Sequence, residues 1–379
     1  MAQSTTLRLR ALWFSVHKWI GILLAILIIP ISLTGSALVW HDWLDETVNP
    51  QRYAVTGAAA LAPGAYAAAA RAALGPGERV LSIRYPEHGG GPVTVTAVGA
   101  AEPGAPRPAR TNVWLDPADG RVLDKAPSDA GLVRVLHSLH GNLMVPGWGR
   151  TIVGWVGVFM FLSCLTGIWL WWPVTGGVRR GFRWRRQPST NANLHHQMGF
   201  WILLPLAMLS FTGFWISFPS AFSAFEASQP KPRGGPPDRA RALRAQPVPK
   251  TALTADSALA AARPHAGGRL LSVAWPTDQS PKWKVSFERA GGPAEVEIAD
   301  ASGQATPPKP PRPETLARTM RRWHDGTGMG PVWQVVIVIG GIVPALLAVT
   351  GVLMWLRSRR WRGDVDRKRK ARLAPQAAE

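Results

Sequence analysis

The histidines of this sequence recur at fixed distances from glycines and from Thr-Gly pairs. In one arrangement a Gly follows the His by four residues and a Thr-Gly pair begins seventeen residues after it, which occurs at His17 and again at His195. In the other, a Thr-Gly pair begins 26 residues after the His, which occurs at His140 and again at His324. The pairs are Thr34-Gly35, Thr166-Gly167, Thr212-Gly213 and Thr350-Gly351. Equal spacings at two distant places indicate an internal duplication.

Two imidazoles on facing helices are suited to the two axial positions of a haem iron. A Gly four residues after a His lies on the same helix face, where it leaves room for the macrocycle. We therefore expect two haem b groups, one bound by His17 and His195 and the other by His140 and His324. The Thr-Gly pairs are expected level with the opposite His pair, where they too would admit a porphyrin face.

Several neighbouring residues are less strongly indicated as haem ligands or as partners of the haem propionates. His196 and His137 are second choices as ligands, because the duplication has Lys18 and Arg321 at the matching positions. The remaining histidines are interpreted as surface or interface residues; they are His41, His88 and His265. Basic residues beside the pairs are candidate partners of haem propionates: Arg8, Arg10, Lys18, Arg134, Arg150, Arg318, Arg321 and Arg322.

Two alternative interpretations of the histidines remain. A lone His at a helix end is commonly structural, although four at repeat-related positions argue against this. A zinc site would need three or four ligands at one level, and only Asp325, beside His324, offers a nearby carboxylate. The single cysteine, Cys164, excludes an intrachain disulfide and covalent haem attachment through a C-x-x-C-H motif.

The elements that carry these histidines are long apolar segments without Asp, Glu, Lys or Arg. Each is long enough to cross a hydrocarbon core of ~30 Å as a helix. They are Trp19–Trp40, Thr151–Trp172, Gln197–Phe225 and Pro331–Leu356. A cleaved signal peptide is disfavoured at the first of them, because its apolar span is too long.

The formal net charge of +20 is concentrated beside the apolar segments, which is typical of membrane topology and not of nucleic-acid binding. The basic loop around Arg179–Arg186 and the basic tail are expected in the cytoplasm, together with both termini. An even number of helices per copy gives both copies one orientation. The His17 and His195 level is then cytoplasmic, and the His140 and His324 level faces outward.

The two outer segments show the same order of elements. A helix at Leu61–Leu74 precedes strands at Arg79–Tyr85, Pro92–Val98 and Thr111–Leu115, and a helix at Ala255–Ala262 precedes strands at Arg269–Trp275, Lys282–Glu288 and Ala294–Ile298. The expected order is an N-terminal segment with the first span (1–40), a first outer module (41–149), the second span (150–173), a basic cytoplasmic loop (174–195), the third span (196–219), a linker with a second outer module (220–330), the fourth span (331–356) and a basic tail (357–379). The predicted fold is thus a mainly α membrane protein, with two parallel helix-pair repeats and two small α+β modules outside the membrane.

The motifs around the histidines resemble those of the PepSY-associated transmembrane family over nearly the whole chain. The residues that carry the resemblance are Leu139-His140-Gly141, Thr166-Gly167-Ile168-Trp169-Leu170-Trp171-Trp172-Pro173, Leu194-His195 with Gly199, and Trp323-His324-Asp325-Gly326 with Thr350-Gly351. The resemblance implies PepSY-like modules outside the membrane. It also implies a role like that of family members that are inner-membrane ferric-siderophore reductases with two b-type haems.

We therefore expect an oxidoreductase of the bacterial inner membrane that passes electrons to a periplasmic ferric siderophore or similar chelate and releases Fe(II). The chain has no G-x-G-x-x-G fingerprint, so its electron donor is expected to be a separate cytoplasmic protein or a quinol. Two alternatives stay open. One is an electron carrier to a periplasmic redox protein, and the other is a non-redox PepSY regulator of a peptidase.

Overall fold

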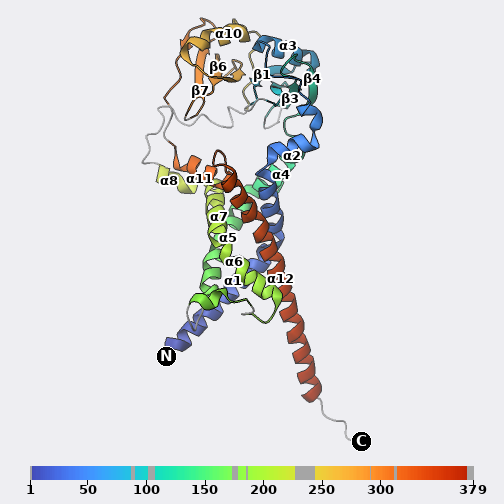
Figure 1. Ribbon diagram of the computed structural model, residues 1–379, viewed down its shortest axis with the longest axis vertical. Coiled ribbons are helices and arrows are strands. Elements are labelled where there is room, and N and C mark those ends of the chain that lie inside the picture. Colours follow the sequence, from blue (N-terminus) through green and yellow to red (C-terminus); the bar gives the residue numbers. More distant parts are fainter. Residues whose placement is uncertain are drawn as a thin grey trace. The chain divides into compact units, whose positions relative to one another are not determined.

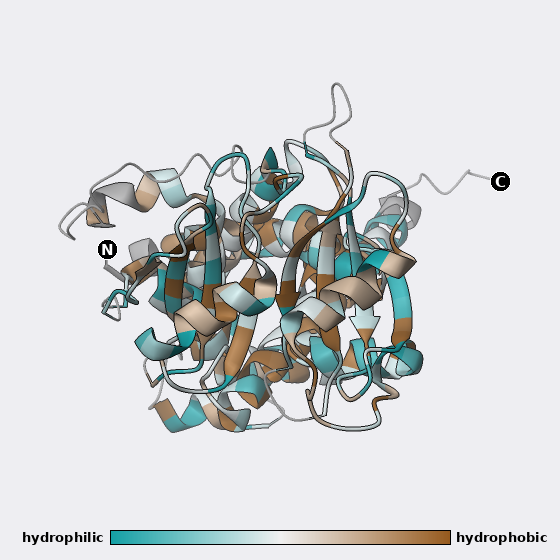
Figure 2. Ribbon diagram, turned by 90° about the horizontal axis from the view of Figure 1, so that it is seen from above, coloured by the Kyte–Doolittle hydropathy of each residue, from teal (hydrophilic) through white to brown (hydrophobic). Residues whose placement is uncertain are grey.

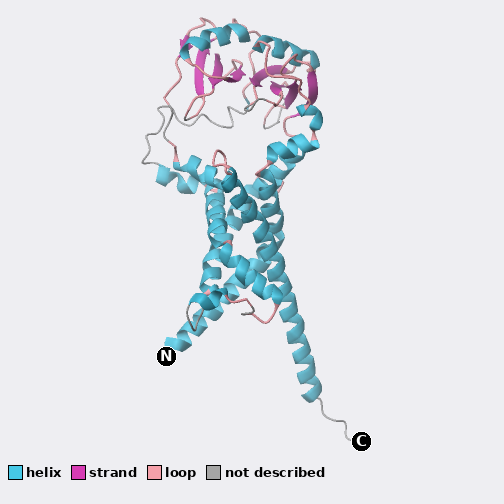
Figure 3. Ribbon diagram, viewed as in Figure 1, coloured by secondary structure: helices cyan, strands magenta, loops and turns pink. Residues whose placement is uncertain are grey.

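The computed structural model describes residues 2–86, 90–100, 107–172, 178–184, 187–226, 244–290, 292–310 and 314–373. His88 and two arginines of the predicted basic loop, Arg185 and Arg186, lie outside these ranges. The chain forms two compact units (Figures 1 and 3). The helical unit comprises Met1–His41, Val135–Gln229 and Glu314–Glu379, and the sheet unit comprises Asp42–Arg134 and Pro230–Pro313.

The helical unit is built on long apolar helices. Its helices are α1 (Ala2–Leu38), α4 (Leu132–Asn142), α5 (Gly149–Trp171), α6 (Thr190–Trp201), α7 (Leu203–Ser217), α8 (Pro219–Glu226), α11 (Leu316–Asp325) and α12 (Pro331–Leu373), with a 3-10 turn, η2, at Val178–Phe182. Helix α1 packs against α5 and α12, and α7 packs against the same two helices. Because many of their large apolar side chains remain exposed, these helices have the surface expected of a bundle in lipid.

Among the residues that the structure describes, three helices are long and apolar enough to span a membrane: Leu7–Leu38, Gly149–Trp171 and Pro331–Arg369. The predicted third span is broken into α6 and α7, which meet at an angle of 66°. Pro205 lies in the first turn of α7, where it cannot donate a hydrogen bond to the carbonyl four residues earlier and its ring crowds that carbonyl. The bend follows from this proline, and the bundle has four spans if the bent pair crosses as one.

The sheet unit is an eight-stranded antiparallel sheet with two helices against it. Its elements are α2 (His41–Val48), η1 (Pro50–Tyr53), α3 (Pro63–Ala73), β1 (Arg79–Arg84), β2 (Val93–Val98), β3 (Arg110–Leu115), β4 (Val122–Pro127), α10 (Ala255–Ala262), η3 (Arg263–His265), β5 (Leu270–Ala274), β6 (Lys282–Phe287), β7 (Ala294–Ala299) and β8 (Ala305–Thr306). The strand order is β4-β3-β2-β1-β5-β6-β7-β8. Hydrophobic and hydrophilic residues alternate along several strands (Figure 2), as expected for a sheet with one buried face.

The two halves of the sheet are joined by β1 and β5, whose sequences are similar at Leu81-Ser82-Ile83 and Leu271-Ser272-Val273. Strand β1 pairs with β5, with Ile83 opposite Val273. Just beyond the paired strands, the Tyr85 N–H donates to the Leu271 carbonyl and the Trp275 N–H donates to the Leu81 carbonyl, each at 2.9 Å. The segments expected in two separate modules therefore form one sheet, with their equivalent strands pairing at its centre.

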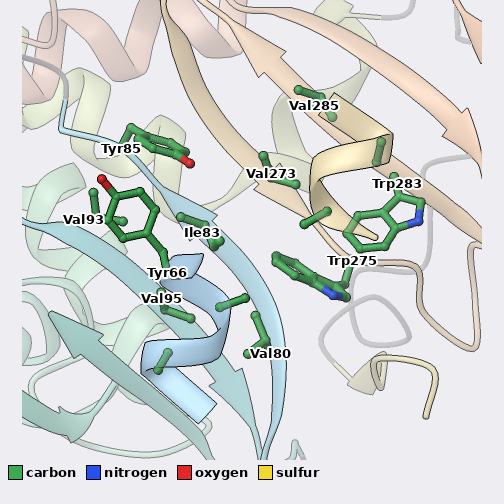
Figure 4. Packing of buried hydrophobic residues seen from close by; sticks show 14 of the residues in the cluster. Tyr66, Val80, Ile83, Tyr85, Val93, Val95, Val273, Trp275, Trp283 and Val285 are labelled. Carbon is green, nitrogen blue, oxygen red and sulfur yellow. The ribbon is translucent and has the colours of Figure 1, made fainter. Parts of the chain in front are cut away.

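A single hydrophobic core continues across this junction (Figure 4). Ile83 and Val273 are fully buried, and Tyr66 from α3 contacts the ring of Tyr85 edge-on. In the second half, Trp283 is fully buried and its indole N–H donates to the Asp300 carboxylate at 2.8 Å. The helices and strands predicted for both modules are confirmed to within one or two residues at most ends, and the structure adds β4 and β8 at the sheet edges.

Candidate functional site

The structure brings the four predicted histidines together as two pairs. His17 on α1 lies beside His195 on α6, with ring centroids 6.3 Å apart and ring planes at 84°. His140 on α4 lies beside His324 on α11, with centroids 5.9 Å apart and planes at 40°. We call these the 17/195 pair and the 140/324 pair. Each pair takes one imidazole from each half of the duplicated sequence.

Helix α1 touches both pairs, which gives their separation along the bundle. It carries His17 itself, and at Thr34-Gly35 it contacts His140. Those positions lie seventeen residues apart, which is roughly 25 Å along a helix at ~1.5 Å per residue. The two pairs are therefore at different levels of the helical unit.

Every one of the four imidazoles is oriented by a hydrogen bond at Nδ1. His17 contacts the Thr166 hydroxyl at 2.9 Å, His195 the Thr350 hydroxyl at 3.0 Å and His324 the Thr212 hydroxyl at 3.0 Å. His140 instead contacts the backbone carbonyl of Ile31 at 2.8 Å. A hydrogen bond from the second ring nitrogen to a fixed oxygen is what orients metal-binding histidines in general.

These contacts also fix which ring nitrogen carries the proton. Each of the three threonine hydroxyls donates its single hydrogen to carbonyls of its own helix, such as Leu162 for Thr166 and Met208 for Thr212. It can then only accept from the imidazole, and the carbonyl of Ile31 likewise only accepts. All four rings therefore carry their hydrogen on Nδ1, which leaves on Nε2 the kind of lone pair through which an imidazole can bind a metal.

The glycine of each Thr-Gly pair lies beside an imidazole from the same half of the sequence, and Gly35 and Gly213 are the two whose missing side chain makes room for the ring. A Cβ at Gly35 would lie 2.6 Å from His140 Cε1, and one at Gly213 would lie 3.2 Å from His324 Cε1. The corresponding distances are 3.4 Å from Gly167 to His17 and 3.6 Å from Gly351 to His195. The expected level of the Thr-Gly pairs is therefore right, and at that level their glycines lie against the histidines. That they also admit a porphyrin face stays a prediction.

The glycines one turn after His17 and His195 behave differently. A Cβ at Gly21 or Gly199 would meet no protein atom within 4 Å. Open space beside a half-buried metal-binding side chain is what a bulky planar ligand requires. This part of the sequence argument, in which a missing side chain leaves room next to the imidazole, agrees with the geometry.

The second-choice histidines lie outside both pairs. His196 stacks on Trp171, with centroids 6.0 Å apart and planes at 22°. His137 lies beside His41, with centroids 6.3 Å apart. Within the described residues, no group of three or more His, Cys, Asp or Glu side chains is placed to bind a metal, so the structure does not assemble the ligand set that a zinc site would need.

Some candidate propionate partners are engaged elsewhere. Arg10 donates to the carbonyls of Trp169 and Leu170 at the end of α5, and Arg150 donates to that of Ile216 at the end of α7. Arg322 forms an ion pair with Glu314 at 2.9 Å. Arg10 and Arg150 thus contact helix C-termini, where cations are favoured by the helix dipole.

Burial favours the neutral form of the histidines of the 140/324 pair. It lowers the pKa of His140, and it lowers the pKa of His324 to about 4, with a further decrease from the neighbouring His140. Neutral imidazole is the form that binds metals. Two neutral imidazoles whose centroids are about 6 Å apart match the separation expected for a pair of rings bound to one ion through bonds of about 2 Å. The residues present therefore fit an axially ligated haem iron.

The threonine contact at the 140/324 pair can be tested directly. Thr212→Val removes the acceptor of the His324 Nδ1–H, and loss of such an orienting partner lowers metal affinity by about 10–100-fold. If the pair holds a haem, that haem should pass to a scavenging apoprotein correspondingly faster. Thr212→Ser keeps the hydroxyl and should behave as the wild type, and equal rates in all three proteins would show that this contact does not support the ligand.

Comparison with known proteins supports the membrane assignment of the helical unit. A comparison with curated proteins finds no match. The family model described as the PepSY-associated TM region matches residues 14–358, which include all four histidines of the two pairs. The chain therefore belongs to the PepSY-associated transmembrane family and is a membrane protein.

Proposed function

We propose that this protein is a di-haem reductase of the bacterial inner membrane that passes electrons across the membrane to a periplasmic ferric siderophore or similar chelate. The observation that supports this most strongly is that the four histidines form two pairs, with ring centroids 6.3 Å and 5.9 Å apart, in which every Nδ1 atom has an oxygen partner. Haem bound there would supply a reversible one-electron iron couple. Reduction of the chelated Fe(III) to Fe(II) weakens its binding to a chelator with hard oxygen ligands, so the chelator releases the ion.

The protein's own contribution is to fix the ligands and their surroundings. Thr166, Thr350 and Thr212 hold three of the rings in one tautomer, and the Ile31 carbonyl holds the fourth. A haem held by both imidazoles of a pair would be suited to electron transfer and not to oxygen binding. Ligands that are already oriented by hydrogen bonds to neighbouring groups need to move little when the charge of the bound iron changes.

Two haem sites at different levels of the bundle would suit the distance that an electron has to cover across the membrane. The apolar core of a bilayer is ~30 Å thick, so a single buried site would leave a long gap on at least one side. The separation of roughly 25 Å between the two pairs, which follows from the rise of helix α1, would place one site near each membrane face. The 17/195 pair is then the entry site and the 140/324 pair the exit site.

The orientation that we propose has both termini and the 17/195 pair in the cytoplasm, and the sheet unit in the periplasm. It follows from the basic loop near Arg179 and the basic tail after Arg357. The two helix pairs are then parallel repeats related by an axis along the membrane normal. The donor is a separate cytoplasmic protein or a quinol.

Reporter fusions test this orientation. A fusion after Ala100 should be active only with a periplasmic reporter, and a fusion in the basic loop at Arg180 only with a cytoplasmic one, because positive loops are retained inside. Fusion after Arg369 provides a second cytoplasmic control. Matching signals from Ala100 and Arg180 would contradict the proposed arrangement and the assignment of each pair to a membrane face.

The acceptor is tested by anaerobic mixing. Protein reduced with dithionite and freed of excess reductant should show reoxidised haem bands when a ferric siderophore is added, together with Fe(II) captured by a ferrous chelator. Reoxidation by periplasmic extract but by no ferric chelate would favour a protein acceptor. A protein purified without haem bands would contradict both redox functions and favour the PepSY regulator.

A further inference from the structure

The central strands of the sheet unit have one apolar face and one polar face. Ile83 on β1, Val95 on β2 and Val273 on β5 point into the hydrophobic core (Figure 4), to which α3 and α10 also contribute. Because side chains alternate along a strand, the residues between these three lie on the opposite face. The side chains there are mostly polar and are exposed or half-buried, as expected for the solvated face of an antiparallel sheet.

Five polar side chains lie together at the centre of this second face, around Arg84. Thr94 and Ser272 are the cross-strand partners of Arg84 on either side, Ser286 is opposite Ser272 on the next strand, and Ser82 precedes Arg84 by two residues on β1. Directly opposed side chains of an antiparallel pair have Cβ atoms about 5 Å apart. We call these five residues the Arg84 patch, and it lies across the junction between β1 and β5.

The side chains of the Arg84 patch differ from their polar neighbours on the same face in being unpaired. On one side of the patch the Thr96 hydroxyl donates to the Asn112 amide oxygen at 2.9 Å, and on the other Lys284 forms an ion pair with Glu295 at 3.1 Å. Within the described part of the chain, no residue forms a hydrogen bond or an ion pair with any of the five side chains of the patch. The centre of the face therefore presents unpaired polar groups between paired ones.

The chemistry of the Arg84 patch favours an anionic ligand with many oxygen atoms. The guanidinium has five N–H donors and no acceptor, and each of the four hydroxyls has a hydrogen to donate. Arg84 is exposed, so its planar fork can reach two oxygens of a bidentate anion. Glu295, which is opposite Ser286 on β7, does not neutralise this charge because it is paired with Lys284.

We propose that the Arg84 patch binds ferric chelates that carry a net negative charge, such as a tris-catecholate. The identity of the ligand rests on the proposed function, in which a chelate with hard oxygen ligands is the electron acceptor. Three catecholates bring more negative charge than Fe(III) neutralises, whereas three hydroxamates give a neutral complex. The guanidinium would contact oxygens of the chelate directly, and the hydroxyls would donate to others around it, so the patch selects for charge.

The experiment uses the full-length protein in detergent with Ga(III) chelates as probes, because Ga(III) has the charge of Fe(III) but is not reduced. Equilibrium dialysis with metal analysis should show that Ga(III) tris-catecholate binds more tightly than Ga(III) tris-hydroxamate. Arg84→Gln should weaken binding of the tris-catecholate by about 10-fold, as expected for loss of a hydrogen bond between charged groups. Arg84→Lys keeps the charge without the planar fork and should bind with intermediate affinity.

The matched control is Arg71→Gln. Arg71 is an exposed arginine on α3, the helix that packs on the apolar face, so this variant removes the same charge from the sheet unit and should leave binding unchanged. Ser272→Ala, a second variant within the patch, should weaken binding by about 2–5-fold, the effect of one lost hydrogen bond. Equal affinity in the wild type and Arg84→Gln would overturn the proposal, as would an equal loss in Arg71→Gln. Inorganic phosphate binding as tightly as the chelate would also overturn it, because the patch would then be a simple anion site.

The failure of this site and the failure of the proposed function give different results. If Ga(III) tris-catecholate binds through Arg84 but the purified protein holds no haem, the redox function fails and the site stands. If reduced haem is reoxidised by ferric tris-catecholate and ferric tris-hydroxamate at equal rates, in the wild type and in Arg84→Gln alike, the site fails and the redox function stands.

Discussion

His324→Ala is expected to leave about one haem per chain, bound by the 17/195 pair, because an iron loses half of its axial ligation with that imidazole. The remaining haem should still be reduced by dithionite, whereas transfer of electrons to a ferric chelate should be lost. His140→Ala should give the same result, since the two rings are 5.9 Å apart and serve one site. Haem content from the pyridine haemochrome spectrum, divided by protein from amino-acid analysis, gives the ratio.

The matched control for this prediction is His137→Ala. His137 lies on the same face of α4 as His140, but its ring lies beside that of His41. This variant should keep the wild-type haem ratio. If His137→Ala lost haem while His140→Ala kept it, His140 would be wrongly assigned as a ligand of the 140/324 pair.

His195→Ala is expected to remove the other haem and to block electron entry. Its ring is 6.3 Å from that of His17 and is held by the Thr350 hydroxyl. The remaining haem, at the 140/324 pair, should be reduced by dithionite but only slowly by the donor present in membrane vesicles. Stopped-flow spectra of vesicles supplied with a respiratory substrate would measure this, with a drop in rate of at least ~10-fold expected from a lost metal ligand.

His196→Ala distinguishes ligation from a nearby structural effect. This neighbouring ring stacks on Trp171, away from the 17/195 pair, so its loss should change stability modestly and leave the haem ratio unaltered. The reverse pattern, with haem lost in His196→Ala and kept in His195→Ala, would contradict the assignment.

Much of the site was accessible from the sequence because the chain is duplicated. The shared spacings picked out His17, His195, His140 and His324, and the structure brings these same four side chains together in the predicted pairs. A single copy would have left each of them indistinguishable from a structural histidine at a helix end. The duplication likewise predicted the core strands, since their apolar alternation appears twice.

Other features depend on contacts that spacing does not specify. The role of Thr166 and Gly167 depends on which ring lies opposite them, and that is set by helix packing. The pairing of β1 with β5 depends on two distant segments meeting edge to edge, which a local pattern does not encode. The short edge strand β8 has too few residues to show alternation. The bend near Pro205 was not predicted, and Pro30 and Pro344 show why, since they too lie in apolar runs but the helices α1 and α12 continue through them.

The haem content of the wild-type protein tests the central claim most directly. Purified full-length protein, saturated with haem during expression, should contain about two haem b groups per chain, both low-spin by electron paramagnetic resonance because both axial positions are filled by imidazole. Saturation at one haem per chain, a high-spin signal from either site, or the absence of haem would contradict the two-site account.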